Sequence, residues 1–356
     1  MVYREAGIYH TTYAQDARLF PLPADRLGIA LLLGAAVVVA PLLGEYWLRG
    51  ILIPFLVYGL AALGLNLVTG YAGLLSLGQA AFMAVGAYTA AILYGRYGVP
   101  VPLSLLAAGL MGALVGAAAG APSLRIKGLY LAVATLCAQF LIVWTIQRVP
   151  WISGGVYATL NIPPVRLGPW VLDSPAEQYY LALVVVAGLT VFGLNLVRTR
   201  VGRAWQAIRE QDVSAAIVGV SLLRYKLLAF AASSFYAGVA GALVVFSWYG
   251  AANIEEFNLL NSIRILGMVV IGGMGSVLGS FLGAAFVTLL PIFVSVILYA
   301  VAKATGGAVT TDVVANLEHV LFGGLIILFL AVEPLGLAHL WKRLKDRLRL
   351  WPFPYY

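Results

Sequence analysis

Long apolar runs separated by short polar stretches make up most of this chain of 356 residues. A helix needs about 20 mostly apolar residues to cross the hydrocarbon core of a bilayer. The run at 262–277 is short and rich in glycine, which favours a broken or partly re-entrant segment. Counting it, we predict ten membrane-spanning helices: 27–44, 50–69, 74–94, 101–120, 129–147, 178–197, 227–250, 262–277, 278–299 and 312–332.

The overall composition supports this interpretation. Hydrophobic residues make up 62% of the chain, charged residues only 10%, and the mean hydropathy is +0.96. An ordinary soluble domain is about 25% charged. This chain has too few charges to cover a water-facing surface. We therefore predict an all-α integral membrane protein of about ten transmembrane helices, some short or broken.

Lys and Arg residues gather on one side of the predicted spans. With the N-terminus inside, the cytoplasmic side holds three of them in the tail 1–26, two in 121–128, six in 198–226 and five in 334–356, together sixteen of 22. Cytoplasmic loops of membrane proteins carry such an excess. We therefore predict both termini in the cytoplasm, and attribute the net charge of +8 to this asymmetry rather than to nucleic-acid binding. The basic residues left on the outer side are Arg49, Arg96, Arg148, Arg166, Arg264 and Lys303.

The same pattern divides the chain into regions. The first 26 residues lack the features of a signal peptide and are predicted to form a cytoplasmic tail. Residues 27–333 hold the spans, and 334–356 form a basic cytoplasmic tail that we expect to lie as a helix at the membrane surface. The outer loop 148–177 is expected to be structured, because Trp151, Tyr157 and Trp170 need cover.

Polar side chains inside the spans are few, and a polar group in hydrocarbon needs a partner or a wet cavity. The run from Tyr71 to Gln79 has two glycines and two polar side chains at membrane depth, so a break in the helix is expected there. Broken helices place backbone groups on a translocation path. Interhelical hydrogen bonds alone are the alternative; for Ser76 and Gln79 the two stay open, and for Thr135 and Gln139 we favour hydrogen bonds.

Two further features bear on chemistry. Arg264 follows two outer acidic residues, Glu255 and Glu256, and we favour an ion pair or snorkelling over contact with a substrate carboxylate. No Gly-Lys pair exists, so the chain lacks the P-loop that binds ATP. The three histidines are far apart, so no metal site is predicted, and we find no set of groups that indicates an enzyme.

Glycines at four-residue spacing predict close helix packing. Gly112, Gly116 and Gly120 fall on one face of a helix, and we expect the same of Gly275, Gly279 and Gly283. Small residues at this spacing let helix backbones approach closely in lipid. The motif therefore predicts packing and carries no information on a substrate.

The longest polar stretch, 198–226, is the most informative part of the chain. If 203–219 is one helix, a shallow apolar face follows, made mostly of small side chains. A helix that binds the lipid surface needs bulky apolar residues instead. We therefore favour a docking surface for another protein, formed by Trp205, Ile208, Ala215, Ala216 and Gly219.

Four blocks of the sequence resemble a known family. They are NLVTGYAGLLSLGQAAFMAVGAYTAAIL (66–93), LRIKGLYLAVATL (124–136), GRAWQAIREQDVSAAIVGVSLLRYKLLAF (202–230) and GMVVIGGMGSVLGSFLGAAFVTLLP (267–291). In this order they are similar to the permease subunits of branched-chain amino acid ABC transporters, closest to the larger, leucine/isoleucine/valine type. Permeases for urea and short amides are closely similar, and stay open as an alternative.

The resemblance implies an importer in a bacterial or archaeal inner membrane. It implies a second permease subunit, the same or different, two cytosolic ATPase subunits that bind ATP and Mg²⁺, and an extracytoplasmic binding protein; no cofactor is expected on this chain. A stand-alone secondary transporter or channel is the alternative of another class, and it would require ionisable residues in mid-span.

The resemblance also assigns candidate residues. The loop 198–226 would hold the coupling helix, and Ala215, Ala216 and Gly219 match its Ala-Ala and Gly, although Ser214 stands where an acidic residue is usual. With these three we group Arg203, Arg209 and Glu210 as ATPase-coupling residues. The candidate residues of the translocation path are Asn66, Ser76, Gln79, Thr135 and Arg264.

Overall fold

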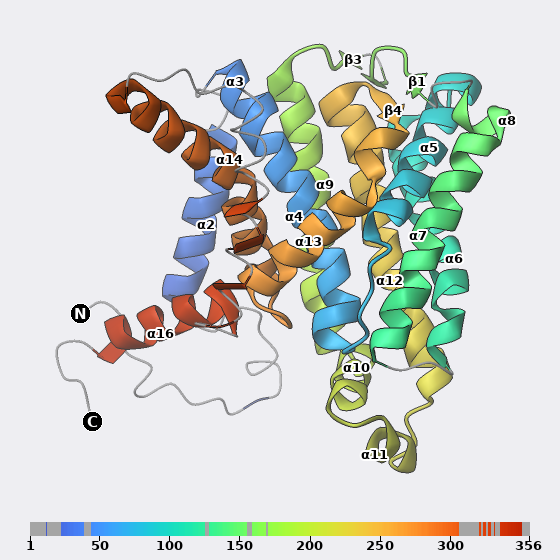
Figure 1. Ribbon diagram of the computed structural model, residues 1–356, viewed down its shortest axis with the longest axis vertical. Helices are drawn as coiled ribbons and strands as arrows, with labels where there is room; N and C mark the ends of the chain where they lie inside the picture. Colours follow the sequence, from blue (N-terminus) through green and yellow to red (C-terminus); the bar gives the residue numbers. More distant parts are fainter. Residues whose placement is uncertain are drawn as a thin grey trace.

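The computed structural model describes residues 23–38, 44–124, 128–154, 159–168, 170–305 and 335–350, with position 12 and short pieces between 320 and 331. Helices dominate, which confirms the predicted all-α membrane protein with some short or broken helices (Figure 1). The helices are α2 (Pro23–Val38), α3 (Glu45–Trp47), η2 (Leu48–Leu52), α4 (Ile53–Asn66), η3 (Leu67–Tyr71), α5 (Gln79–Tyr97), α6 (Val101–Gly120), η4 (Ala121–Leu124), α7 (Leu129–Arg148), α8 (Pro150–Ser153), α9 (Pro175–Arg198), α10 (Arg200–Glu210), α11 (Asp212–Ile217), α12 (Leu222–Leu243), η5 (Val244–Tyr249), η6 (Ile254–Phe257), α13 (Leu259–Gly272), α14 (Val277–Thr305) and α16 (Gly336–Leu350).

Six helical segments of the described chain are long and apolar enough to cross a membrane. Three further predicted spans lie outside these six segments. The spans 27–44 and 262–277 correspond to the shorter apolar helices α2 and α13, and 74–94 corresponds to α5, which begins only at Gln79. The run 312–332 lies mostly outside the described residues, so the number ten stays a prediction. The six long segments are Glu45–Tyr71, Val101–Gly120, Tyr130–Arg148, Pro175–Arg198, Leu222–Tyr249 and Val277–Val296.

Helices α4 and α12 form the centre of the bundle and are mostly buried. Helix α12 packs against α4, α5 and α6, and α14 and α9 also pack against α4. The backbones of α6 and α12 approach closely at glycine: a methyl group on Gly112 would lie 2.4 Å from the Ser234 carbonyl oxygen. The predicted packing role of the glycine stripe in α6 is thereby confirmed.

The second glycine stripe differs from the prediction. Gly279 and Gly283 lie in α14 and approach the backbone of α13, but Gly275 precedes the helix, in the turn 273–276. Its φ of +80° belongs to the left-handed region, which glycine enters without steric cost. Gly275 therefore serves the turn between α13 and α14 rather than a helix face.

The predicted break after Tyr71 is confirmed. The 27-residue segment 45–71 ends at η3, residues 73–78 run without helical structure, and α5 starts at Gln79. Together with the turn 273–276, this gives two interruptions within the described helices 45–305, which we call the α5 break (72–78) and the α14 turn (273–276).

The connection 148–177 is folded, as predicted, at one end of the bundle (Figure 1). It contains α8 and three short strands, of which β1 pairs antiparallel with β4 and β2 with β3. The expectation that its aromatic residues need cover is wrong for Trp151 and Trp170, which are exposed; Tyr157 lies outside the described residues. Tryptophan is common at membrane–water interfaces, where one edge of the ring stays wet. The strands are β1 (Thr159–Asn161), β2 (Arg166–Leu167), β3 (Trp170–Val171) and β4 (Ala251–Asn253).

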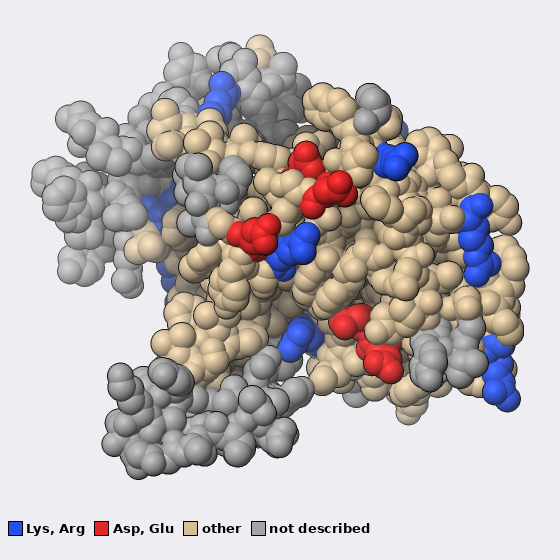
Figure 2. All heavy atoms as spheres, turned by 90° about the horizontal axis from the view of Figure 1, so that it is seen from above, with Lys and Arg blue, Asp and Glu red and all other residues tan. Residues whose placement is uncertain are grey.

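Helices α10, α11 and α16 lie at the opposite end (Figure 1). The predicted single helix 203–219 is two helices, because Gln211 adopts an extended conformation with φ −162° and ψ 112° between them. Helix α16 is amphipathic and packs against α13 and α14. Viewed from the strand end, acidic and basic side chains are scattered rather than gathered into one patch (Figure 2).

Candidate functional site

Side chains from two other helices hold the start of α5 inside the bundle. The first N–H groups of a helix have no partner within it and need acceptors elsewhere. The Ser262 hydroxyl accepts from the Ala80 amide at 2.9 Å, and the Gln139 side-chain oxygen accepts from the Ala81 amide at 2.8 Å. Just before the helix, the Leu77 amide donates to the Thr135 hydroxyl at 2.9 Å. Helices α7 and α13 thus stabilise the α5 break.

The other polar residues predicted near the break are also buried. Gln79 donates to the Ala61 carbonyl at 3.0 Å and accepts from the Ser233 hydroxyl at 3.3 Å. Ser76 is 2% exposed, and its hydroxyl has no hydrogen-bond partner within the described part of the chain. Gln79 therefore ties α5 to α4 and α12, while Ser76 keeps an unused hydroxyl in the unwound segment.

Asn66, the last residue of α4, holds the second interruption. Its amide nitrogen donates to the Ser276 carbonyl and the Ser280 hydroxyl, both at 2.8 Å. Its side-chain oxygen accepts from the Gly275 amide, also at 2.8 Å. One side chain at the end of α4 thus holds the α14 turn.

The five predicted path residues therefore fall into two groups. Asn66, Ser76, Gln79 and Thr135 lie at the two interruptions, and three of them use their polar groups in hydrogen bonds between segments. Arg264 lies apart from them in α13, beside the Tyr58 hydroxyl of α4. The structure brings four of the five to one region, and their role in a path stays a prediction.

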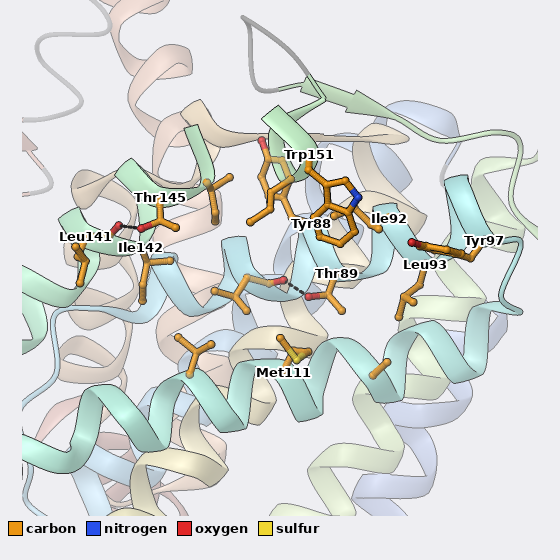
Figure 3. Close-up of a pocket in the computed structure, with 15 residues that line it drawn as sticks. Tyr88, Thr89, Ile92, Leu93, Tyr97, Met111, Leu141, Ile142, Thr145 and Trp151 are labelled. Carbon is orange, nitrogen blue, oxygen red and sulfur yellow. Dashed lines mark hydrogen bonds between the residues drawn. The ribbon is translucent and has the colours of Figure 1, made fainter. Parts of the chain in front are cut away.

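A separate groove lies between α5, α6 and α7, with a volume of about 520 Å³ (Figure 3). Its lining is apolar, and includes Met111, Leu141 and Trp151. The hydroxyls of Thr89 and Thr145 donate to carbonyls of their own helices, at 2.7 Å each. The groove thus offers hydrocarbon contact but few groups for an ammonium or a carboxylate, so we do not assign the path of an amino acid to it.

The α10–α11 unit at the other end is fixed to the bundle. Trp205 is buried, and its indole nitrogen donates to the Tyr225 carbonyl at 2.8 Å. Lys226, 3% exposed, forms an ion pair with Asp212 at 2.8 Å, which holds the start of α11 against α12. Burial of a charge is costly unless it is paired, so this contact fixes the position of α11.

The predicted docking face divides between these two helices. Trp205, Ile208 and Ala215 are buried against the protein, whereas Ala216 and Gly219 are exposed. Gly219 has a φ of +96° in the turn that follows α11. The exposed apolar surface at the tip of α11 is bulkier than predicted, since it includes Val213, Ile217 and Val218. The signal that could have found them is a cluster of aliphatic residues inside a polar loop.

The charged candidates of α10 differ in their contacts. Arg203, Arg209 and Glu210 are all largely exposed. The Arg209 guanidinium, however, also donates to the carbonyl of Gly70, at the end of η3. Arg209 is therefore the member of this group that connects α10 with the interrupted helices.

Comparison with known proteins places this geometry in context. Residues 48–330 match the family described as the permease component of the branched-chain amino acid transport system. The high-affinity branched-chain amino acid transport system permease protein LivM of Escherichia coli (strain K12) is 36% identical over 252 residues, 64% of this chain and 59% of the relative. The corresponding protein BraD of Pseudomonas aeruginosa is 27% identical over 297 residues, 79% of this chain and 91% of the relative.

Another relative is named for the import of a different compound. The autoinducer 2 import system permease protein LsrC of Enterobacter sp. (strain 638) is 31% identical over 201 residues, 54% of this chain and 55% of the relative. The chain spans about three fifths of the length of the LivM proteins that it matches. No solved structure matches it. A multi-pass membrane protein whose family match covers both interruptions and the α10–α11 unit thus belongs to the permease components of branched-chain amino acid transport systems.

Proposed function

We propose that this chain is the permease subunit of an ATP-driven, binding-protein-dependent importer of branched-chain or other apolar amino acids. The observation that carries the proposal is the α10–α11 unit, which presents an apolar tip beyond the bundle and is fixed to it through buried contacts. Exposed apolar residues on a short, well-fixed helix favour docking of another protein. The family match over 48–330 supports the same conclusion.

The proposal assigns the other parts of the transporter to other chains. Two cytosolic subunits would bind ATP and Mg²⁺, hydrolyse ATP and receive the α11 tip in a recess. A second permease would complete the pore, and an extracytoplasmic binding protein would deliver the amino acid to the strand end. The chain itself then carries no catalysis and no cofactor. It lies in the inner membrane with both termini in the cytoplasm, as the excess of basic residues favours.

The decisive experiment is reconstitution. The chain is expressed with candidate ATPase and permease subunits, the complex is purified through a tag on this chain, and uptake of radiolabelled leucine into proteoliposomes is measured. We expect co-purification of both partners, and uptake that needs ATP and the binding protein. Uptake by the chain alone, driven by an ion gradient, would contradict the proposal and favour a secondary transporter.

A second arm of the experiment addresses the substrate. The printed names of the relatives include both branched-chain amino acids and autoinducer 2. Unlabelled leucine, isoleucine, valine, urea and a short amide are therefore tested as competitors of the labelled leucine. We expect all three amino acids, and neither urea nor the amide, to compete. Absence of leucine uptake together with ATP-dependent uptake of labelled urea or amide would assign the chain to the other branch of the family.

A further inference from the structure

Arg209 occupies a notch formed by three glycines: Gly70 at the end of η3, Gly73 in the α5 break and Gly275 in the α14 turn. Its guanidinium donates to the carbonyl of Gly70, and a methyl group on Gly275 would lie 2.9 Å from a guanidinium nitrogen. A methyl group on Gly73 would lie 3.0 Å from Cγ and 3.2 Å from Cα of Arg209. The end of α10 therefore rests directly on the backbone of the α5 break, at a place where any side chain would intrude.

The two interruptions are themselves joined at this notch. Asn66, one turn before Gly70, holds the Gly275 amide and the Ser276 carbonyl. A methyl group on Gly70 would lie 2.4 Å from the Gly275 nitrogen, so the two backbones are in contact. Arg209 thus contacts both backbone segments of this junction. It donates a hydrogen bond to Gly70 and packs against Gly275.

This geometry gives α10 a mechanical connection to the interior. Gly73 and Gly275 have φ values of +69° and +80°, so both interruptions have turn conformations that other residues rarely adopt. Short interruptions of helices are the places where backbone dihedrals absorb a movement. A displacement of α10 must therefore shift the junction or break its contact with Arg209.

We propose that Arg209 is the positioning residue that transmits movement of the α10–α11 unit to the α5 break and the α14 turn together. The inference rests on the proposed function, because the movement would start at an ATPase docked on α11. It adds to that function the residue that connects the docking unit with the interior. The Arg209 guanidinium lies in the notch of three glycines, away from the α11 tip that would contact the ATPase. Ser76 then lies on the segment that moves.

The test follows the α5 break directly. Ser76→Cys is introduced into a Cys137→Ser background, since Cys137 is the single cysteine of the chain and is exposed. The purified complex with its ATPase subunits is labelled with a small maleimide, with and without ATP and vanadate. We expect nucleotide to change the labelling rate at position 76 by about fivefold or more, the lower range of allosteric coupling.

Arg209→Gln should reduce this nucleotide effect to less than about twofold, while the ATPase subunits still co-purify and hydrolyse ATP. Gly73→Ala should have the same effect. It keeps the Arg209 side chain but adds a methyl group that would lie 3.0 Å from Cγ of Arg209 and displace it from the notch. Arg200→Gln is the matched control, because Arg200 is an exposed arginine of the same helix and belongs to no candidate set; it should keep the full effect.

The outcomes separate the inference from the function on which it rests. A nucleotide effect that persists unchanged in Arg209→Gln and Gly73→Ala overturns the role of Arg209 and leaves the proposed function intact. A complex that hydrolyses ATP without any change at position 76 overturns it as well, because the break then does not move. If no ATPase binds the wild-type chain, the proposed function fails, and the inference fails with it.

Discussion

Single side chains hold the interrupted start of α5, and Gln139 has the most contacts there. Its side-chain oxygen accepts from the Ala81 amide and the Ser262 hydroxyl, and its nitrogen donates to the Phe257 carbonyl at 2.9 Å. Gln139→Leu would leave these buried groups without partners, which costs about 1–3 kcal/mol each. We expect a clearly lower midpoint of thermal unfolding, measured on the purified protein in detergent.

Thr145→Val provides the control for this prediction. Thr145 lies on the same helix, but its hydroxyl donates only to the Leu141 carbonyl of its own turn. The variant should unfold within about a degree or two of the wild type, because replacing this hydroxyl by a methyl group of similar size leaves no polar group of another segment without its partner. Equal stability of both variants would show that the α5 break does not depend on the Gln139 contacts.

The ion pair between Asp212 and Lys226 is the second residue-scale feature. Because Lys226 is 3% exposed, Asp212→Ala leaves a buried ammonium without its carboxylate. We expect Asp212→Ala to lower the unfolding midpoint and leucine uptake. The double variant Asp212→Ala/Lys226→Met should recover part of the stability, because it removes the buried charge.

A double-mutant cycle measures this coupling. Glu210→Gln, at an exposed position two residues before Asp212, is the matched control for stability and should leave the unfolding midpoint nearly unchanged. Additive effects of the two single substitutions would mean that the pair does not fix α11.

At the scale of elements, the tip of α11 is the surface that a partner would contact. Ile217 is 81% exposed and Val218 85%. Ile217→Asp should abolish co-purification of the ATPase subunits, because a charge cannot be desolvated in an apolar recess without cost. Leu344→Asp on α16 also replaces an exposed aliphatic residue at the same end of the molecule, and should leave the complex intact. Loss of the ATPase subunits in both variants would point to general destabilisation instead.

The elements also show what the sequence can predict. Helices such as α6, α7 and α9 follow from apolar runs of spanning length, and the α5 break follows from glycine and polar residues at membrane depth. The split at Gln211 was not predicted, because the helical periodicity of 203–219 continues through a residue whose extended backbone has no mark of its own in the sequence.

The candidate site was predicted less completely for a physical reason. Asn66 and Ser280 are 214 positions apart, and Gln139 and Ser262 are 123 apart. Each residue could be identified as polar and buried, but a single sequence carries no signal for which distant residue is its partner. The contact of Arg209 with Gly70 was missed for the same reason, since a basic residue in a polar loop is usually solvated.

At the scale of the whole molecule, the two ends should face different compartments. Helices α10, α11 and α16 lie at one end, and β3 lies at the other (Figure 1). Cysteines at Ile217, Leu344 and Trp170, each in the Cys137→Ser background, are accessible probes because all three side chains are exposed. In intact cells, a membrane-impermeant maleimide should label position 170 only.

Inverted vesicles from cells that express the chain without its ATPase subunits should give the opposite pattern, with labelling at 217 and 344. The prediction has two separable parts. The fold requires positions 217 and 344 to lie on the same side of the membrane, whichever way the protein is inserted. The distribution of basic residues predicts that this side is the cytoplasm. Labelling of both from outside would reverse the orientation and exclude docking of a cytosolic ATPase, while the fold would stand. Labelling of 217 and 344 from opposite sides would instead contradict the arrangement of α16 beside α13 and α14.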